Sequence, residues 1–224
     1  MIKNVIFDCF GTLIDTGTGS MDAVRSILTN VNLNVDADEF YSEWKIKKKE
    51  MTYFDEFYSE KELFKMSLAE MFKKYNVTAD IDEAVQPMIR VLFGERKAFP
   101  DTAEILEYLD KAGINYAIGS TTDNDSLIHF LDMNNLSIPL VFTSEDMRVY
   151  KPVPDFYTKI LEKTGWKYEE TLFVGDNLVD DVKGPKSVGM RSALIDRKGR
   201  YSNNSGIKPD FVFNSLKELK SIIK

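Results

Sequence analysis

Acidic, hydroxyl and lysine side chains follow four short apolar runs of this chain, at the points where buried strands would end. In an open parallel sheet, ligands bind beyond the carboxyl ends of the strands, so we expect these side chains to share one edge of a sheet. They are Asp8 after residues 5–7, Ser120 after residues 116–118, Lys151 in the loop that follows residues 140–142, and Asp176 with Asp181 after residues 172–174.

These residue types indicate attack by a carboxylate on an anionic substrate. The carboxylate of Asp8 can be a nucleophile. If the substrate is a phosphate ester, each unit-charge repulsion at about 4 Å costs roughly 4 kcal/mol at an effective dielectric constant of about 20. Mg²⁺ with oxygen ligands would offset that repulsion, and Asp176 and Asp181 supply carboxylates for it. Lys151 can neutralise remaining charge, and Ser120 with nearby backbone N–H groups can hold the transferring oxygens.

The elements that would position these residues are predicted by the apolar runs themselves. Each run is too short for a helix and is typical of a strand that is buried on both faces. Helical patterns at 103–112 and 155–164, each followed by a glycine, separate some of the runs. Strands that alternate with helices indicate a Rossmann-like α/β core with three layers. The predicted strands contain residues 5–7, 116–118, 140–142, 172–174, 193–195 and 211–213.

The stretch after the first predicted strand is different, because it holds aromatic and apolar residues at helical spacing and no convincing strand. We therefore predict a catalytic core at 1–16 and 97–224 with an inserted helical domain at 17–96. The two apolar stripes comprise Phe40, Trp44, Met51, Phe54 and Tyr58, and then Phe64, Leu68, Phe72 and Tyr75.

Composition limits the partners and the location of the protein. The net charge of −7 over 224 residues argues against a nucleic-acid or membrane-surface binder and favours a small-molecule substrate. The single cysteine, Cys9, excludes an internal disulfide and fits a reducing compartment. The apolar run that ends at Asp8 is too short for a signal peptide, so a cytoplasmic location is expected. The oligomeric state cannot be predicted from the sequence.

Four segments together resemble the four motifs of the haloacid dehalogenase (HAD) superfamily in order and spacing. The resemblance implies a Rossmann-like core, a helical cap inserted after the first motif and an aspartyl-enzyme intermediate. The segments are Phe7 to Leu13, Ser120, Lys151 with Pro152, and Gly175-Asp176 with Asp181.

The resemblance also implies roles for individual residues. Asp8 would be the nucleophile, and Ser120 and Lys151 would stabilise the intermediate. Asp176 and the carbonyl of Phe10 would bind Mg²⁺ together with Asp8, and Asp181 would support the metal directly or through water. Phe10, Gly11, Thr12 and Thr121, which adjoin Asp8 and Ser120, would contact the substrate.

Phe10 departs from the pattern of the superfamily phosphatases, which usually carry a second aspartate at this position. That aspartate protonates the leaving group, and such acid–base catalysis contributes about 100- to 10,000-fold. The 2-haloacid dehalogenase branch also has an aromatic residue here, and its cap carries a tryptophan-basic segment that Trp44 and Lys45 partly match. In that branch an arginine stands where this chain has Lys45, and the metal-binding pair is missing, whereas Asp176 and Asp181 are retained here. We therefore favour a Mg²⁺-dependent phosphatase over a metal-free dehalogenase or a weakly active or non-catalytic binding protein on this scaffold.

Several of these residues also have simpler interpretations. Trp44 shares its stripe with Phe40 and fits a helical core better than a substrate contact. Asp176 and Asp181 could cap the helix after Gly175.

Overall fold

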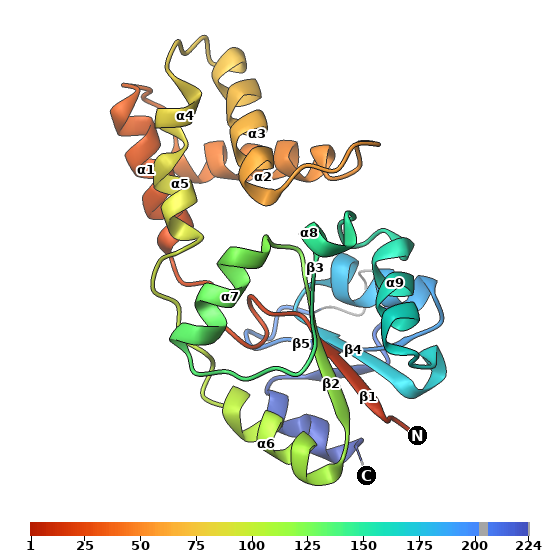
Figure 1. Ribbon diagram of the computed structural model, residues 1–224. Coiled ribbons are helices and arrows are strands. Elements are labelled where there is room, and N and C mark those ends of the chain that lie inside the picture. The colour runs from red at the N-terminus through yellow and green to blue at the C-terminus, as the bar shows by residue number, and fades with distance from the viewer. Residues whose placement is uncertain (202–205, 224) are drawn as a thin grey trace. The chain divides into compact units, whose positions relative to one another are not determined.

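The computed structural model describes residues 1–201 and 206–223 and divides them into two compact units. The core unit comprises Met1–Asp15, Lys97–Thr121 and Leu131–Lys224, and the helical unit comprises Thr16–Arg96 and Thr122–Phe130. Figure 1 shows the strands of the core unit and the helices of the helical unit.

A parallel sheet forms the centre of the core unit, and among the described residues it has six strands in the order β3-β2-β1-β4-β5-β6. This confirms the predicted α/β class, and each predicted apolar run lies in or overlaps one strand. The strands are β1 (Asn4–Phe7), β2 (Asn115–Ser120), β3 (Val141–Thr143), β4 (Thr171–Gly175), β5 (Arg191–Ile195) and β6 (Phe211–Phe213).

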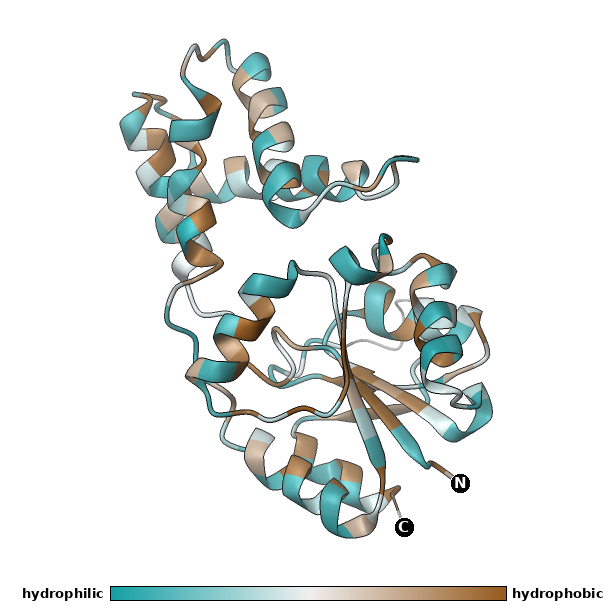
Figure 2. Cartoon of the chain, in the orientation of Figure 1, coloured by the Kyte–Doolittle hydropathy of each residue, from teal (hydrophilic) through white to brown (hydrophobic). Residues whose placement is uncertain are grey.

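The sheet positions the predicted site because β1 lies between β2 and β4. Phe7 pairs in register with Ile118 of β2 and with Val174 of β4. The carboxyl ends of these three strands therefore lie at the same edge of the sheet, where Asp8 directly follows β1. The central strands are coloured mostly as hydrophobic in Figure 2, as expected for strands covered on both faces.

Helices cover both faces of this sheet. Phe156, Tyr157 and Ile160 of α9 pack in one cluster with Ile6 and Phe173 of the strands. The opposite side carries α6 and the C-terminal η4, which pack against each other (Figure 1). The helical segments of the core unit are α6 (Thr102–Ala112), α8 (Ser144–Met147), α9 (Pro154–Thr164), η1 (Tyr168–Glu170), η2 (Leu178–Lys183), α10 (Gly184–Ser187) and η4 (Leu216–Ser221).

Both helices that were predicted from a closing glycine end there. Gly113 after α6 and Gly165 after α9 have φ values of 68° and 69°. This left-handed conformation is accessible to glycine without a steric penalty, so the chain can leave the helix at that point.

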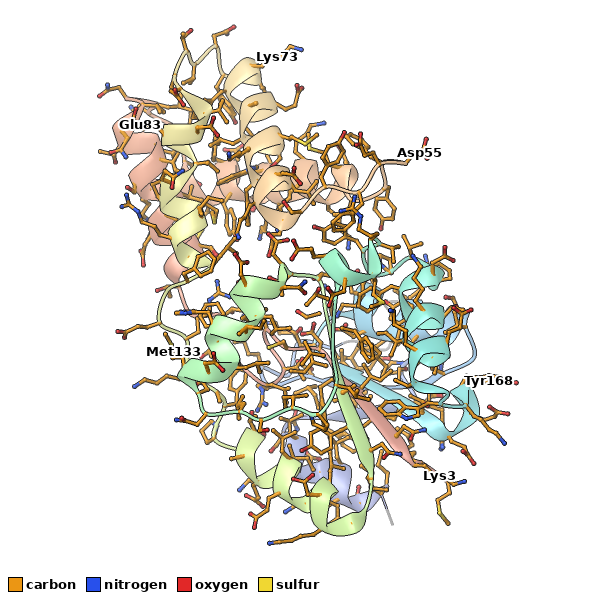
Figure 3. The ribbon with its side chains drawn as sticks, viewed as in Figure 1. Lys3, Asp55, Lys73, Glu83, Met133 and Tyr168 are labelled. Carbon is orange, nitrogen blue, oxygen red and sulfur yellow. The ribbon has the colours of Figure 1, made fainter. Side chains whose placement is uncertain are left out.

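The helical unit is built around Trp44, which is 1% exposed and donates a 2.7 Å hydrogen bond from its indole to Ser67 Oγ. Around it pack Phe40, Phe64 and Leu68. Lys73 and Glu83 point away from this core (Figure 3). The helices are α1 (Gly19–Asn30), α2 (Ala37–Met51), α3 (Glu60–Lys74), α4 (Ile81–Ala84) and α5 (Gln86–Val91); α7 (Asn124–Met133) contributes residues to both units.

One predicted stripe is shorter than expected. Helix α2 ends at Met51, and Phe54 is 51% exposed beyond its end. Helix α3 begins at Glu60, where Ser59 and Glu62 form a capping box in which each side chain accepts from the backbone N–H of the other residue. Phe54 and Tyr58, the last two residues of the predicted stripe, therefore lie between α2 and α3 and not on a helix.

The helical unit includes residues 122–130 in addition to the predicted insertion at 17–96. Asp123 accepts hydrogen bonds from the backbone N–H groups of Glu60 and Lys61 at 2.7 and 3.2 Å. The hydroxyl of Ser126 donates to the carbonyl of Leu92 at 2.8 Å. Hydrogen bonds between residues this far apart in the chain leave no periodic pattern in the sequence, so residues 122–130 could not be assigned to the helical unit from the sequence.

Candidate active site

Asp8 and Lys151 meet at the carboxyl edge of the sheet, although 143 positions separate them in the chain. Lys151 Nζ lies 2.7 Å from Asp8 Oδ1 and 2.8 Å from Asp181 Oδ1. The lysine side chain is 2% exposed, and those of Asp8 and Asp181 are 10% and 1% exposed. The predicted loop lysine is therefore a buried cation between two carboxylates.

Three carboxylates converge at this point. One oxygen each of Asp8, Asp176 and Asp181 can be chosen so that all lie within 4.8 Å of one another. Together with Lys151 they leave two formal negative charges. We call these four residues the acidic cluster. Only oxygen ligands are offered, as a hard divalent cation such as Mg²⁺ prefers, and one such cation would balance the charge.

Two glycines make room for the acids. A Cβ atom on Gly11 would lie 2.4 Å from Asp176 Oδ2, and a Cβ atom on Gly175 would lie 2.2 Å from Asp181 Cγ. Gly11 also has a φ of 95°, which L residues with side chains rarely adopt. Glycine at these two positions is therefore required by the close approach of the carboxyl groups, a role that the sequence did not reveal for Gly175.

Burial and mutual repulsion raise the pKa of two of these acids. Burial, followed by the charges of Asp181 and Asp176, raises the pKa of Asp8 to about 7, although Lys151 acts in the opposite direction. Loss of hydration around the carboxyl group and the charge of Asp181 raise the pKa of Asp176 to about 6. Burial alone would lower the pKa of Lys151, but Asp181 and Asp8 outweigh it and raise that pKa. Lys151 therefore stays charged, and the repulsion between the remaining negative charges makes Asp8 and Asp176 harder to ionise.

The turn after β4 positions Asp181 through Asn177. The Asn177 side chain accepts hydrogen bonds from the N–H groups of Val179 and Asp180 at the start of η2. The backbone N–H of Asn177 in turn donates to Asp181 Oδ2 at 3.0 Å. Asn177, and not Asp176 or Asp181, thus caps this segment, so the acids are available to the cluster.

The other predicted site residues of the core unit adjoin the cluster in the chain or in the sheet. Thr12 is fully buried and donates from its hydroxyl to Asp8 Oδ2 at 3.3 Å. Ser120 is the last residue of β2, the neighbour of β1, and is 1% exposed, with Thr121 next to it. Phe10 forms an isolated bridge with Ile14. Binding of metal by the Phe10 carbonyl, and of substrate by Phe10, Gly11, Thr12 and Thr121, stays a prediction.

Trp44 and Lys45 belong to the helical unit. The burial of Trp44 matches the core role that its stripe favoured. The ammonium group of Lys45 lies 4.7 Å from the centroid of the Tyr41 ring. A substrate contact for either residue stays a prediction.

The sequence reasoning missed Arg197 and Asp101, which hold the loop after β1. Arg197 donates to both carboxylate oxygens of Asp101 and to the carbonyl of Thr12. Arg197 follows the apolar run at 193–195 closely, so the rule that located Asp8 and Asp176 could have found it.

The chain belongs to the haloacid dehalogenase-like hydrolase family, whose model matches residues 5–195. It is an enzyme of the hydrolase class, and the convergence of Asp8, Lys151, Asp176 and Asp181 fits that class.

Relatives with different activities cover nearly the whole chain. Glyceraldehyde 3-phosphate phosphatase of Methanocaldococcus jannaschii is 29% identical over 100% of this chain and 98% of its own length. (S)-2-haloacid dehalogenase 1 of a Pseudomonas species is 25% identical over 99% of this chain and 96% of its own. The magnesium-bound structure of the putative hydrolase YfnB from Bacillus subtilis has a TM-score of 0.79 at 19% identity, covering 99% of this chain and 98% of that one, and shows the shared fold.

The longest helices of the described residues, α2 and α3, have 15 residues each. Within residues 1–201 and 206–223, no helix combines the length and the apolar character that crossing a bilayer requires.

Proposed function

We propose that this hydrolase is a Mg²⁺-dependent phosphatase that acts on a small phosphorylated metabolite. The observation that carries the proposal is the convergence of three carboxylates within 4.8 Å beside a buried lysine. A metal-free reaction at Asp8 would have no need of Asp176, whose pKa is raised by burial and by the charge of Asp181. Phosphatases among the full-length relatives support the same choice.

The chain's own residues supply a nucleophile and its orientation. Ionised Asp8 would attack phosphorus, the bond from phosphorus to the leaving oxygen would break, and an aspartyl phosphate would form. Water would then release inorganic phosphate and restore the carboxylate. Lys151 holds one oxygen of Asp8 and Thr12 the other, so the carboxylate is oriented before the substrate arrives. Mg²⁺ bound by Asp8, Asp176 and Asp181 would neutralise charge on the transferring group.

Phe10 limits the substrates, because a phenyl ring cannot protonate the leaving oxygen. We infer that esters with acidic leaving groups are preferred. The rate should fall steeply from p-nitrophenyl phosphate to phenyl phosphate, by up to the 100- to 10,000-fold that a missing general acid costs. Equal rates on the two esters would show that another residue protonates the leaving group.

The second candidate function is 2-haloacid dehalogenation, and Phe10 is the observation that favours it. A halide leaves as an anion and needs no proton. The experiment compares phosphate release from p-nitrophenyl phosphate, with Mg²⁺ and with a chelator, against halide release from chloroacetate. Phosphate release that requires Mg²⁺ supports the phosphatase; halide release that persists in chelator supports the dehalogenase. Activity in neither assay contradicts both proposals and favours a binding protein on this scaffold.

A further inference from the structure

Arg197 lies two residues after β5, and the proposed mechanism gives its side chain no part. Its Nη1 and Nη2 donate to the two carboxylate oxygens of Asp101, at 3.0 Å each. Nη2 also donates to the carbonyl oxygen of Thr12 at 2.9 Å. The Arg197 and Asp101 side chains are 18% and 7% exposed, so this contact is largely shielded from water.

Asp101 is itself fixed, which leaves the guanidinium one orientation. The hydroxyl of Ser215 and the backbone N–H of Leu216 donate to Asp101 Oδ2 at 2.7 and 2.8 Å. The Phe99 ring lies against the guanidinium, with 3.8 Å from its centroid to the central carbon of Arg197. A planar fork that pairs with a carboxylate and stacks on a ring is a geometry that lysine cannot reproduce.

Thr12 connects this contact to the nucleophile. Its carbonyl accepts from Arg197, while its hydroxyl donates to Asp8 Oδ2. The other oxygen, Asp8 Oδ1, is held by Lys151. At the next residue, the carbonyl of Leu13 accepts from the hydroxyl of Thr102 at 2.7 Å. The backbone carbonyls of Thr12 and Leu13 are thus both held by side chains, while the Thr12 hydroxyl bonds to Asp8.

We propose that Arg197 is a positioning residue that orients the Asp8 carboxylate through Thr12. The proposal rests on the proposed role of Asp8 as nucleophile. Arg197 acts on the backbone of Thr12 and does not touch the reacting atoms. Loss of its fork lets the loop shift, and the second oxygen of Asp8 then loses its fixed partner.

The test measures kcat and KM for p-nitrophenyl phosphate with saturating Mg²⁺ in Arg197→Lys, Thr12→Val and the double variant. We expect kcat of Arg197→Lys to fall about 10- to 100-fold with little change in KM, since a small misplacement of reacting groups has that effect. In the Thr12→Val background the same change should cost much less, because the connection is already cut. Arg191→Lys, at the other end of β5, serves as the control and should keep the wild-type rate.

Hydrogen exchange of the amides of residues 8–15 provides a readout that needs no turnover. Exchange should accelerate in Arg197→Lys and not in Arg191→Lys. Independent, multiplicative effects of Arg197→Lys and Thr12→Val on kcat, or unchanged exchange in Arg197→Lys, would overturn the proposal. A wild-type protein without phosphatase activity would contradict the proposed function instead. In that case the exchange experiment still decides whether Arg197 holds the loop.

Discussion

The acidic cluster and the Arg197–Asp101 pair each contain one cation, but the cluster has three carboxylates and the pair has one. In the acidic cluster Lys151 pairs with Asp8 and Asp181 but is the one cation beside three carboxylates, and burial and repulsion raise the pKa of Asp8 to about 7. Burial would also raise the pKa of Asp101, but bonds from Arg197, Ser215 and Leu216 outweigh it and lower that pKa below its ordinary value. The Arg197–Asp101 pair is electrically balanced and stabilises the fold. The acidic cluster carries two surplus negative charges, which a divalent cation could neutralise.

The opposite pKa shifts imply opposite responses to pH. A carboxyl group with a lowered pKa contributes stability above its ordinary pKa of about 4, and loses that contribution as the pH falls. A carboxyl group with a raised pKa contributes stability below about pH 4, and in the metal-free protein loses it as the pH rises through about 7 for Asp8. The surplus charge of the site thus weakens the fold at neutral pH unless a cation binds.

Asp8→Asn should have the largest effect, because it removes both the proposed nucleophile and one of the surplus negative charges of the acidic cluster. We expect kcat for p-nitrophenyl phosphate to fall by at least about 10,000-fold, as for loss of a catalytic nucleophile. The midpoint of thermal unfolding in chelator should be unchanged or higher, because one of the crowded charges is gone. Asp155→Asn, an exposed acid in the first turn of α9, is the matched control and should retain activity. Near wild-type turnover in Asp8→Asn would remove Asp8 from the mechanism.

Lys151→Met removes the only cation of the acidic cluster. The free energy of unfolding in chelator should fall by about 3–5 kcal/mol at pH 7, the usual cost of leaving buried charges unpaired. The loss should shrink in acid, where the carboxyl groups are protonated. Urea unfolding of this variant and of Lys163→Met, an exposed lysine on α9, measures the difference. Equal stability of the two variants would show that Lys151 does not balance the cluster.

Asp101→Asn breaks the balanced pair and should show the opposite dependence on pH. We expect a loss of about 1.5–3 kcal/mol at pH 7, typical of hydrogen bonds to a charged group. The gap to wild type should begin to close as the pH falls below about 4, where the unfolded chain is protonated first, and should vanish only below the lowered pKa of Asp101, where the folded wild type is also neutral. Asp132→Asn, an exposed acid near the end of α7, is the control. A gap that widens in acid would contradict the lowered pKa of Asp101.

Gly175→Ala tests whether Asp181 must keep its position for the acidic cluster to bind Mg²⁺. The added Cβ would meet Asp181 Cγ at 2.2 Å, so Asp181 must move. If Asp181 supports Mg²⁺, affinity measured by titration calorimetry should weaken about 10- to 100-fold, as when a group that supports a metal ligand is disturbed. Gly94→Ala, whose Cβ would meet its nearest atom at an ordinary 3.6 Å, should bind Mg²⁺ like wild type. Unchanged affinity in Gly175→Ala would exclude Asp181 from the metal site.

The sequence by itself determined which segments form strands and where their reactive ends lie. Runs such as residues 5–7 and 172–174 are apolar on both sides of the strand, so their burial and the position of Asp8 and Asp176 after them could be predicted. Gly113 and Gly165 marked helix ends because glycine adopts the left-handed conformation without a steric penalty. Strand burial and helix ends depend on residues that are neighbours in the chain, so short sequence patterns can predict them.

Only the tertiary structure decided how distant residues share charge. Lys151 lies between Asp8 and Asp181 because β1 pairs with β4, and the order of strands leaves no mark on any single run. The clearance at Gly175 and the reach of Arg197 to Thr12 likewise depend on side chains that are far apart in the chain. Close packing and buried charge pairing depend on which distant segments are in contact, so only the folded structure reveals them.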